Sequence, residues 1–373
     1  MNQKEVIKLA KKAGYKVKKV EPLTQDASQR QYFRIYTSLE VDTPHDDDEL
    51  NPTIFILCYL DPKLGSHERL VEINKSLNEY EYSNLAPKIF FYDKNLGITI
   101  QENIGDEGID LYNLYDDFGP PGSEFYHEDS FYSAFSMALG LLNDMQGKKI
   151  PNIHKVKENE LINQMKTFES VYLSNFLCIS PFEIAAQRKN IKKLIKETIK
   201  KLDSQPWVNC HTDFEGRNIL LTTNFDWDYM YLIDYQDMCI GPAGIDLAGI
   251  IFDHYQYQNF DIEEIKNQIA KSSIVWSTEM PFRFEEIKEE RGRKLVADEI
   301  FEYARWGAIQ RNMRILGTLS NLYLQQKRSF RLPDLELILL NLNSAIPEEY
   351  VELKSFIKDS VFFANAKRVE EIL

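Results

Sequence analysis

The segment Val208–Ile250 constrains the fold of this chain more than any other. Within it, Asp213 and Asn218 frame a short polar loop with four residues between them. An apolar strand, a turn and a second strand follow, and the second strand ends at Asp234. This order predicts a catalytic loop followed by a hairpin, with three polar side chains that act together.

The three side chains suit phosphoryl transfer. That reaction needs a carboxylate to orient the attacking hydroxyl and accept its proton, and metal ligands to neutralise the phosphates. Asp213 can serve as the base, while Asn218 and Asp234 supply the hard oxygen ligands that magnesium prefers. Asp and Asn in loops more often cap turns, but the five-residue spacing followed by strand, turn and strand favours the catalytic interpretation.

The first third of the chain combines strands with few helices. A helix that ends near Gly14 opens the chain, and a second helix begins after Ser66. Five strand-like segments accompany them: Val17–Leu23, Gln31–Tyr36, Thr53–Leu60, Lys88–Tyr92 and Gly97–Asn103. A polar, acidic stretch between the second and third segments indicates an exposed hairpin loop. This layout predicts the small lobe of a kinase, although other α+β domains share it.

The remainder is mostly helical. Helical periodicity covers 131–145, 156–175, 183–202 and 294–326, and helices resume after Pro242. The last of these carries an apolar stripe formed by Ile309, Met313, Leu316, Leu319 and Tyr323. We therefore predict an α+β, bilobal protein-kinase-like fold with a β-rich, nucleotide-binding N-lobe over residues 1–103. A larger helical C-lobe over 104–373 would hold the catalytic loop, metal and substrate.

Six motifs occur in a fixed order along nearly the whole chain. They are DASQRQYFR at 26–34, YLDP at 59–62, CHTDFEGRN at 210–218, LIDYQD at 232–237, GPAGIDLAG at 241–249 and WGAIQRNMRILG at 306–317. The chain resembles the aminoglycoside phosphotransferase and choline kinase superfamily. More narrowly, it is similar to the cell-wall amino-sugar anomeric kinases, which are N-acetylmuramate/N-acetylglucosamine 1-kinases.

The resemblance implies a role for each residue of the catalytic segment. Asp213 would be the base, Asn218 a metal ligand and Asp234 the principal metal ligand. Asp246 would buttress the loop by accepting hydrogen bonds from it. His211 would pack against and orient the loop, and would not shuttle protons.

The spacing that follows the metal ligand favours a small-molecule acceptor. Only eleven residues separate Asp234 from Asp246, which leaves no room for the activation segment of a protein kinase, and we find no A-P-E motif. Asp237 would contribute to the substrate or metal site, with simple solvation as the alternative. Arg311, together with Arg314, would reach a substrate carboxylate or acetamide from the long helix, although solvated arginines are common on helices.

The nucleotide side departs from the usual kinase pattern. The candidate phosphate turn, 24–31, has no glycine and offers Ser28 and Arg30 instead, and the third strand lacks a lysine. Arg34 and Lys63 are further candidates for phosphate contacts. These departures leave open a pseudokinase that binds nucleotide without turning it over.

The connection after the fifth strand is the expected docking place for the adenine ring. Gln101, Glu102 and Ile104 would offer backbone groups there. ATP with Mg²⁺ is the expected cofactor pair, and the sequence leaves GTP open. A sugar or amino sugar is the expected acceptor; an aminoglycoside or choline-type cation, which would suit the acidic stretch 106–129, is the alternative.

Charge and composition limit the partners. The formal net charge of −14 disfavours nucleic acid, because binding it requires Lys and Arg to release counterions. The N-terminus lacks an apolar signal, and no run approaches the length that spans a bilayer, so no membrane partner is expected. Four scattered cysteines, expected to be buried free thiols, fit a cytoplasmic protein. The sequence leaves the oligomeric state open.

Overall fold

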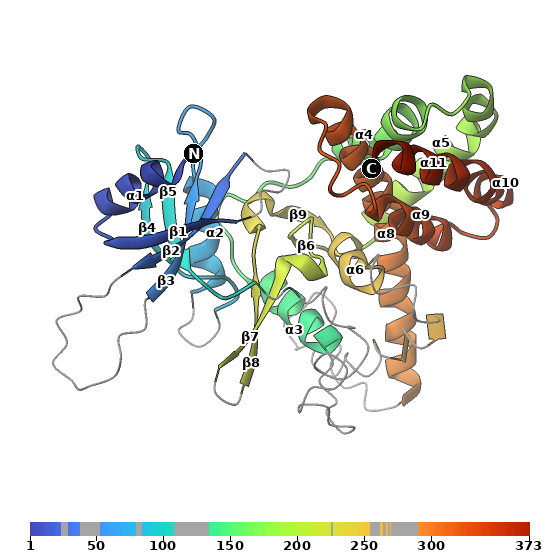
Figure 1. The fold of residues 1–373 in the computed structure, drawn as a ribbon. Helices are drawn as coiled ribbons and strands as arrows, with labels where there is room; N and C mark the ends of the chain where they lie inside the picture. The colour runs from blue at the N-terminus through green and yellow to red at the C-terminus, as the bar shows by residue number, and fades with distance from the viewer. Residues whose placement is uncertain are drawn as a thin grey trace, which may run out of the picture. The chain divides into compact units, whose positions relative to one another are not determined.

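A computed structural model describes residues 1–23, 29–37, 53–79, 84–106, 108, 134–224, 227–253, 262–263, 266–267, 269 and 290–373 (Figure 1). The chain divides into two compact units, each described by itself. The first unit contains Met1–Glu107, Lys148–Pro151 and Leu220–Gln236, and the second contains Gly108–Gly147, Asn152–Ile219 and Asp237–Leu373. The hairpin that precedes Asp234 therefore clusters with the first unit, whereas the sequence-based division assigned it to the second.

A five-stranded antiparallel sheet forms the first unit, in the order β1-β2-β3-β5-β4. Its strands are β1 (Val17–Pro22), β2 (Gln31–Thr37), β3 (Thr53–Tyr59), β4 (Ile89–Asp93) and β5 (Ile98–Glu102). These bounds lie within one or two residues of the sequence-based ones, because alternating and continuous apolar runs are the strongest local signal for strands.

Helix α1 (Gln3–Lys12) packs on this sheet. It begins with a capping box in which the Asn2 side chain accepts from the Glu5 amide at 3.0 Å and the Glu5 carboxylate accepts from the Asn2 amide at 2.8 Å. Its inner face and the sheet share one buried cluster: Val6, Ala10, Val20, Phe33, Ile35, Leu57, Ile98 and Ile100. This apolar core gives the sheet a covered face, which a solvated antiparallel sheet requires for stability.

Polar contacts attach the hairpin β7 (Ile219–Asn224) and β8 (Trp227–Leu232) to the rest of the first unit. The Leu232 amide donates to the Leu85 carbonyl at 2.7 Å. On helix α2 (Glu68–Leu77), Asn74 Nδ2 donates to the Pro87 carbonyl at 2.8 Å and to the Tyr235 hydroxyl at 2.7 Å. The chain around Asp234 is thus tied to α2 through a buried amide.

The second unit is mainly helical. Its described elements are α3 (Ala134–Gly147), α4 (Glu158–Thr167), the π-helix η2 (Phe168–Phe176), α5 (Pro181–Asp203), β6 (Trp207–Cys210), β9 (Cys239–Pro242), α6 (Gly244–Ile251), α8 (Glu290–Gln326), α9 (Asp334–Ala345), α10 (Val351–Phe356), the π-helix η7 (Ile357–Val361) and α11 (Phe362–Ile372). Helix α8 packs against α4, η2, α5, α6 and α9 (Figure 1). It is the element around which the unit is organised.

Helix α8 differs from the amphipathic helix that the sequence predicts. The apolar stripe is buried as expected at Ile309, Met313 and Leu316. Gln310 and Arg311 are also buried, each only 1 % exposed, so the helix is enclosed on more than one side. The difference arises because neighbouring elements cover its polar residues as well, which periodicity alone does not reveal.

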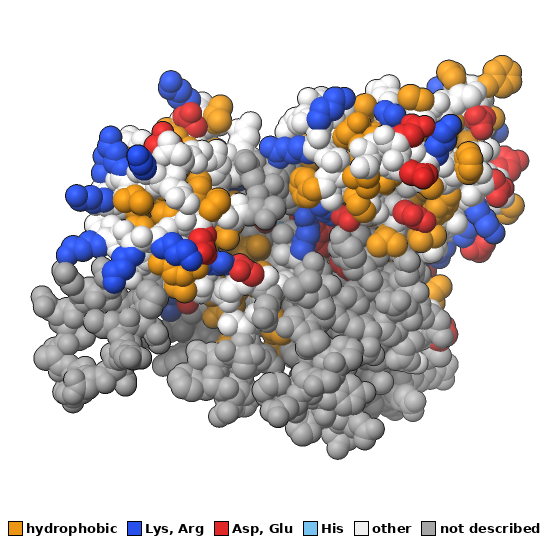
Figure 2. Space-filling view, in the orientation of Figure 1, with side chains coloured by type: hydrophobic (Ala, Val, Ile, Leu, Met, Phe, Trp, Pro, Cys, Tyr) orange, Lys and Arg blue, Asp and Glu red, His pale blue; other side chains and the backbone are white. Residues whose placement is uncertain are grey.

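Two sequence-based expectations about the surface can be compared with the structure. Cys58, Cys210 and Cys239 are buried free thiols, but Cys178 is exposed, contrary to the prediction. Within the described ranges, every helix is too short or too polar to span a bilayer. Figure 2 shows acidic and basic side chains interspersed over the visible face of the second unit, with no basic stripe among the residues coloured there.

His67 gives the first unit a pH-dependent stability. The side chain is fully buried, and its Nε2 donates to the Gly97 carbonyl at 3.1 Å. Desolvation lowers the pKa of His67 from 6.5 to about 4. As the pH falls below 6.5, His67 binds a proton in the unfolded chain but not yet in the folded one. The contribution of His67 to the free energy of unfolding is therefore present above pH 6.5 and is lost as the pH falls towards 4.

We therefore expect the free energy of unfolding to fall by roughly 3 kcal/mol from this group between pH 7 and pH 4. Urea denaturation of His67→Gln across that range should show a flatter pH dependence than the unsubstituted protein. His154→Gln, at an exposed position, should leave the slope unchanged. Equal slopes for His67→Gln and the unsubstituted chain would contradict the prediction.

Candidate active site

The loop after β6 turns sharply at Thr212. This residue has φ of 76°, a left-handed conformation that costs a β-branched side chain energy. The neighbouring carboxylate of Asp246 stabilises the turn, because it accepts from the His211 amide at 2.6 Å and from the Thr212 amide at 2.8 Å. The strained residue lies next to Asp213, so the turn sets the direction in which that side chain leaves the backbone.

Asp246 is held below the loop by close packing of α6. A Cβ on Gly249 would overlap the Phe214 carbonyl, so only glycine allows the helix to approach the loop this closely. Burial raises the pKa of Asp246 to about 6, although the two loop amides favour its carboxylate form. His211 is 1 % exposed, and its ring lies edge-on to Phe214 with centroids 6.2 Å apart.

Asp213 is paired with a cation from α8. Arg314 Nη2 donates to Asp213 Oδ1 at 2.7 Å and to the Thr212 carbonyl at 2.9 Å. Desolvation raises the pKa of Asp213, but the Arg314 charge and hydrogen bond outweigh it and hold the pKa below 3.8. The Asp213 side chain stays 39 % exposed. It is therefore an ionised carboxylate that a solute can reach.

Asn218 closes the loop on itself. Its Nδ2 donates to the Asp213 backbone carbonyl at 2.9 Å, which turns Oδ1 the other way. The Asn218 backbone amide donates to the Glu215 carbonyl at 2.8 Å within a short 3₁₀ turn, Gly216–Asn218. The side chain that the sequence assigns to metal thus has its nitrogen committed and its oxygen available as a ligand.

A second ion-pair group lies under the loop. The buried Glu215 carboxylate accepts from Arg217 Nε and from Arg311 Nη2. Arg311 is only 1 % exposed, which argues against the substrate contact that the sequence suggested for it. The physical reason is that a buried guanidinium requires a carboxylate partner inside the protein, and Glu215 provides one.

Asp234 lies in the first unit, directly after β8. Its φ is 62°, its side chain is exposed, and Oδ1 accepts from Gln236 Nε2 at 2.7 Å. Burial, a hydrogen bond to Cys58 and the charge of Asp234 raise the pKa of Tyr32, whereas Arg30 lowers it. Burial raises the pKa of Cys58 to about 12, and Arg30 and Asp234 again act in opposite directions. Arg30 and Asp234 therefore both lie near the cross-strand pair Tyr32 and Cys58.

The residues expected at the adenine position lie at the end of β5. Gln101 Nε2 donates to Thr99 Oγ1 at 2.7 Å, and Glu102 Oε2 accepts from the Lys88 amide at 3.0 Å. Ile104 lies in the irregular chain that follows and is partly buried. The Glu102 amide donates to the Lys88 carbonyl at 2.8 Å, so its N–H is already bonded, and the adenine role of the three residues stays a prediction.

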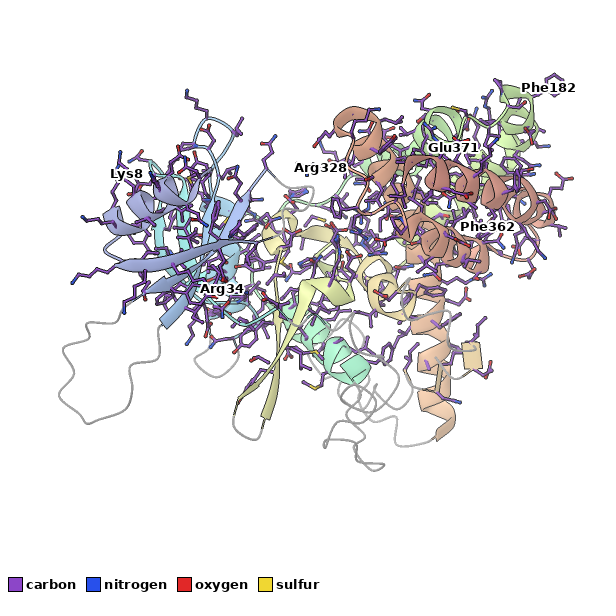
Figure 3. All side chains as sticks on the ribbon, viewed as in Figure 1. Lys8, Arg34, Phe182, Arg328, Phe362 and Glu371 are labelled. Atoms are coloured by element: carbon purple, nitrogen blue, oxygen red, sulfur yellow. The ribbon has the colours of Figure 1, made fainter. Side chains whose placement is uncertain are left out.

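Arg34 has a partner within the first unit. Figure 3 labels Arg34 on the first unit. Its Nη2 forms an ion pair with Asp106, and its Nε donates to Asn103 Oδ1 at 3.3 Å. The contact joins β2 to the chain after β5. The sequence left Arg34 open as a phosphate contact or a solvated residue, and the structure instead gives it this bridging contact.

Several predicted features fall outside the described residues: Ser28, the hairpin loop 38–52, and the acidic stretch apart from residues 106 and 108. Asp237 is described and exposed, in the short turn Tyr235–Asp237. Its substrate role stays a prediction. Glu68 and Glu72 of α2 form surface ion pairs with Lys94 and Arg69.

The contacts of Arg314 with Asp213 and of Arg311 with Glu215 were not predicted from the sequence. The only sequence signal was the spacing of Arg311 and Arg314, one helical turn apart outside the apolar stripe. Such a pair is equally typical of a solvated helix face. Its partners lie about a hundred residues away in the sequence, so local patterns could not identify them.

Asn218 and Asp234, taken separately, each carry the kind of oxygen that magnesium binds together with a nucleotide. Across the part of the chain that the structure describes, no three His, Cys, Asp or Glu side chains gather to hold a metal ion by themselves. Asn218 Oδ1 and the Asp234 carboxylate are hard oxygens, and magnesium usually takes one or two protein ligands with phosphates and waters. These residues fit the metal that the catalytic segment implies.

Comparison with known proteins supports this interpretation. Residues 166–282, which include the catalytic loop, match the model of the phosphotransferase enzyme family. The N-acetylmuramate/N-acetylglucosamine kinase of Neisseria meningitidis serogroup B is 24 % identical over 168 residues, which cover 45 % of this chain and 45 % of that protein. Less than half the length of this relative is therefore matched.

Solved structures show the fold. The ethanolamine kinase of Plasmodium vivax superimposes with a TM-score of 0.56 at 14 % identity, covering 94 % of this chain and 89 % of that one. The choline kinase LicA of Streptococcus pneumoniae gives 0.56 at 15 % identity, covering 91 % and 99 %. The protein-kinase-like α+β fold and the resemblance predicted from the sequence are confirmed.

The contacts of Asp246 generate a stability prediction. Asp246→Ala would leave two loop amides without their acceptor, and an unsatisfied buried donor costs roughly 1–3 kcal/mol. We expect a loss of about 3 kcal/mol in urea denaturation, with faster amide hydrogen exchange at His211 and Thr212. Asp203→Ala, at an exposed position on α5, should change stability little. A loss below about 1 kcal/mol for Asp246→Ala would contradict this account.

Proposed function

We propose that this chain, with the fold of the aminoglycoside phosphotransferase and choline kinase superfamily, transfers the γ-phosphoryl group of ATP to a hydroxyl of a small molecule. One observation carries the proposal: the ionised, partly exposed carboxylate of Asp213 is fixed by Arg314 beside Asn218. A fixed anionic acceptor next to an amide oxygen is the arrangement that phosphoryl transfer requires of the protein.

In the proposed reaction, Asp213 accepts a hydrogen bond from the acceptor hydroxyl and orients its oxygen toward the γ-phosphorus. The new O–P bond forms as the bond to the β-phosphate oxygen breaks, and ADP leaves. The hydroxyl proton passes to Asp213, because the lone pair of the attacking oxygen is consumed in the new bond. Bound magnesium would neutralise charge on the phosphates.

Asn218 and Asp234 are the proposed ligands of that magnesium–nucleotide complex. Asn218 offers Oδ1, since its nitrogen is committed to the Asp213 carbonyl. Asp234 offers the oxygen that does not accept from Gln236. Arg30, which lies near the same Tyr32–Cys58 pair as Asp234, is proposed to contact the phosphates in place of a third-strand lysine.

The proposed acceptor is a sugar or an amino sugar. The support is the order of motifs along the chain and the partial match to a relative whose name specifies N-acetylmuramate and N-acetylglucosamine. The backbone groups near Gln101, Glu102 and Ile104 are proposed to receive the adenine ring. The polar turn with Asp237 is proposed to face the acceptor.

A screen for nucleotide turnover tests this function directly. ADP release would be followed with ATP or GTP, with and without Mg²⁺, over a panel of sugars, amino sugars, amino alcohols and aminoglycosides. We expect stimulation by a sugar or amino sugar that disappears with EDTA. Stimulation by choline or an aminoglycoside alone would change the substrate class, and binding without any turnover would indicate a pseudokinase.

The base is tested by Asp213→Asn. This change keeps the shape of the side chain but removes its ability to accept the proton, so turnover with the best acceptor should fall about 10²-fold or more. The Kd for Mg–ADP, measured by calorimetry, should stay near that of the unsubstituted protein. Asp203→Asn on α5 serves as the control. A variant that retains more than about a tenth of the rate would remove Asp213 from its assigned role.

The metal ligand is tested by Asp234→Asn. Losing the charged oxygen should abolish the gain in nucleotide affinity that Mg²⁺ provides, because the metal prefers carboxylate ligands. In EDTA the variant and the unsubstituted protein should bind ATP equally, which controls for folding. If Mg²⁺ still strengthens ATP binding to the variant as much as before, Asp234 is not the principal ligand.

A further inference from the structure

The motif WGAIQRNMRILG at 306–317 lies in the middle of α8, and the proposed chemistry does not yet account for it. Two glycines bracket its arginines. A Cβ on Gly307 would overlap the backbone carbonyl of Gly244, and a Cβ on Gly317 would overlap the side chain of Thr167. At these two glycines, one on each side of the arginine pair, the backbone of α8 lies directly against its neighbours. This close packing fixes how near α8 lies to them and how far it can slide along its axis.

The arginines between these contacts both hold the catalytic loop. Arg314 donates to Asp213 Oδ1 at 2.7 Å and to the Thr212 carbonyl at 2.9 Å. One turn earlier, Arg311 donates to the Glu215 carboxylate, which is itself only 3 % exposed. Residues three apart share a helix face, so one face of α8 contacts three successive parts of the loop.

The contacts of Arg314 suit positioning better than recognition of an acceptor. Its Nη2 donates both of these hydrogen bonds to the loop, and only 18 % of the side chain is exposed. The two N–H groups of Nη2 lie in the rigid plane of the guanidinium, so binding a backbone carbonyl and a carboxylate from this one nitrogen fixes the carboxylate relative to the main chain. A lysine at this position would supply the charge without that geometry.

We propose that Arg314 is a positioning residue: it holds Asp213 in the orientation that receives the acceptor hydroxyl, while Arg311 holds the same loop through Glu215. This inference rests on the proposed function, because it assigns the arginines a role in that same site. With Oδ1 committed to Arg314, the other carboxylate oxygen of Asp213 is left to meet the hydroxyl. In this motif, the two glycines allow close packing of the helix, and the two arginines between them bind the catalytic loop.

Arg314→Gln tests the inference, because it removes the charge and the fork at a position that is not fully enclosed. We expect kcat to fall about 10²-fold, since a misplaced catalytic group costs roughly that much, with the KM for the acceptor and the Kd for Mg–ADP changed less than about threefold. Arg314→Lys should recover only part of kcat. Added guanidinium ion, far below denaturing concentrations, should restore part of the activity of Arg314→Gln.

Arg305→Gln is the matched control. Arg305 lies on the same helix but donates to the Ala345 carbonyl and to Glu302, away from the loop. It should keep full activity. The double variant Arg314→Gln with Asp213→Asn should lose no more than Asp213→Asn alone, because Arg314 acts only through that carboxylate. Additive losses, or a kcat for Arg314→Gln within twofold of the unsubstituted enzyme, would overturn the inference.

Hydrogen exchange separates this inference from the proposed function. If no acceptor supports turnover, the function fails, yet Arg314→Gln should still speed exchange of the Thr212 and Asp213 amides relative to Arg305→Gln. Unchanged exchange in those amides would overturn the positioning role independently of any activity. If Asp213→Asn abolishes turnover while Arg314→Gln does not, the function stands and only the positioning role falls. Should Arg314→Gln fail to fold, Arg314→Lys carries the same comparisons.

Discussion

Gathering three carboxylates around one short loop depends on the charges and donors that neutralise them. Glu215 and Asp246 are almost completely buried; Glu215 belongs to the loop that carries Asp213, and Asp246 binds that loop. An unpaired buried carboxylate would be very costly. Two arginines from α8, Arg217 from the loop, and two backbone amides supply the compensation. Without them the buried carboxylates next to the strained turn at Thr212 would be unpaired.

This requirement explains why distant elements have to approach the loop so closely. The arginines of α8 reach it only because Gly307 lets that helix lie against the start of α6. Asp246 reaches the loop amides only because Gly249 lets α6 lie against Phe214. Both glycines are buried helical positions, where glycine is otherwise unfavourable. The close approach of the backbones compensates for that lower helix propensity.

Local patterns predicted the elements of the fold well, and the chemistry of the loop partly. The strands and helices follow from apolar periodicity, and the loop residues Asp213 and Asn218 follow from spacing. The sequence assigned Arg311 to the substrate, with a solvated residue as the alternative, and could not reveal that a carboxylate 96 residues away is its partner. Similarly, the sequence could not reveal that Leu232 contacts Leu85 or that Tyr235 contacts Asn74. Pairings between remote segments leave no periodic signal.

The nucleotide side of the first unit differs from the usual kinase pattern, which has a lysine on the third strand and a glycine-rich turn. The guanidinium of Arg34, on the second strand, binds Asp106 and Asn103, so these protein groups occupy it in place of a phosphate. Arg30, four residues earlier, acts electrostatically on Tyr32, Cys58 and His67, and Asp234 acts on the first two of these. A cation and a carboxylate that share neighbours are the kinds of group that the phosphate oxygens and the metal of an Mg–triphosphate require, which is why both residues are proposed for that role. A long arginine at the start of the second strand could therefore supply the charge that a lysine usually supplies from the third.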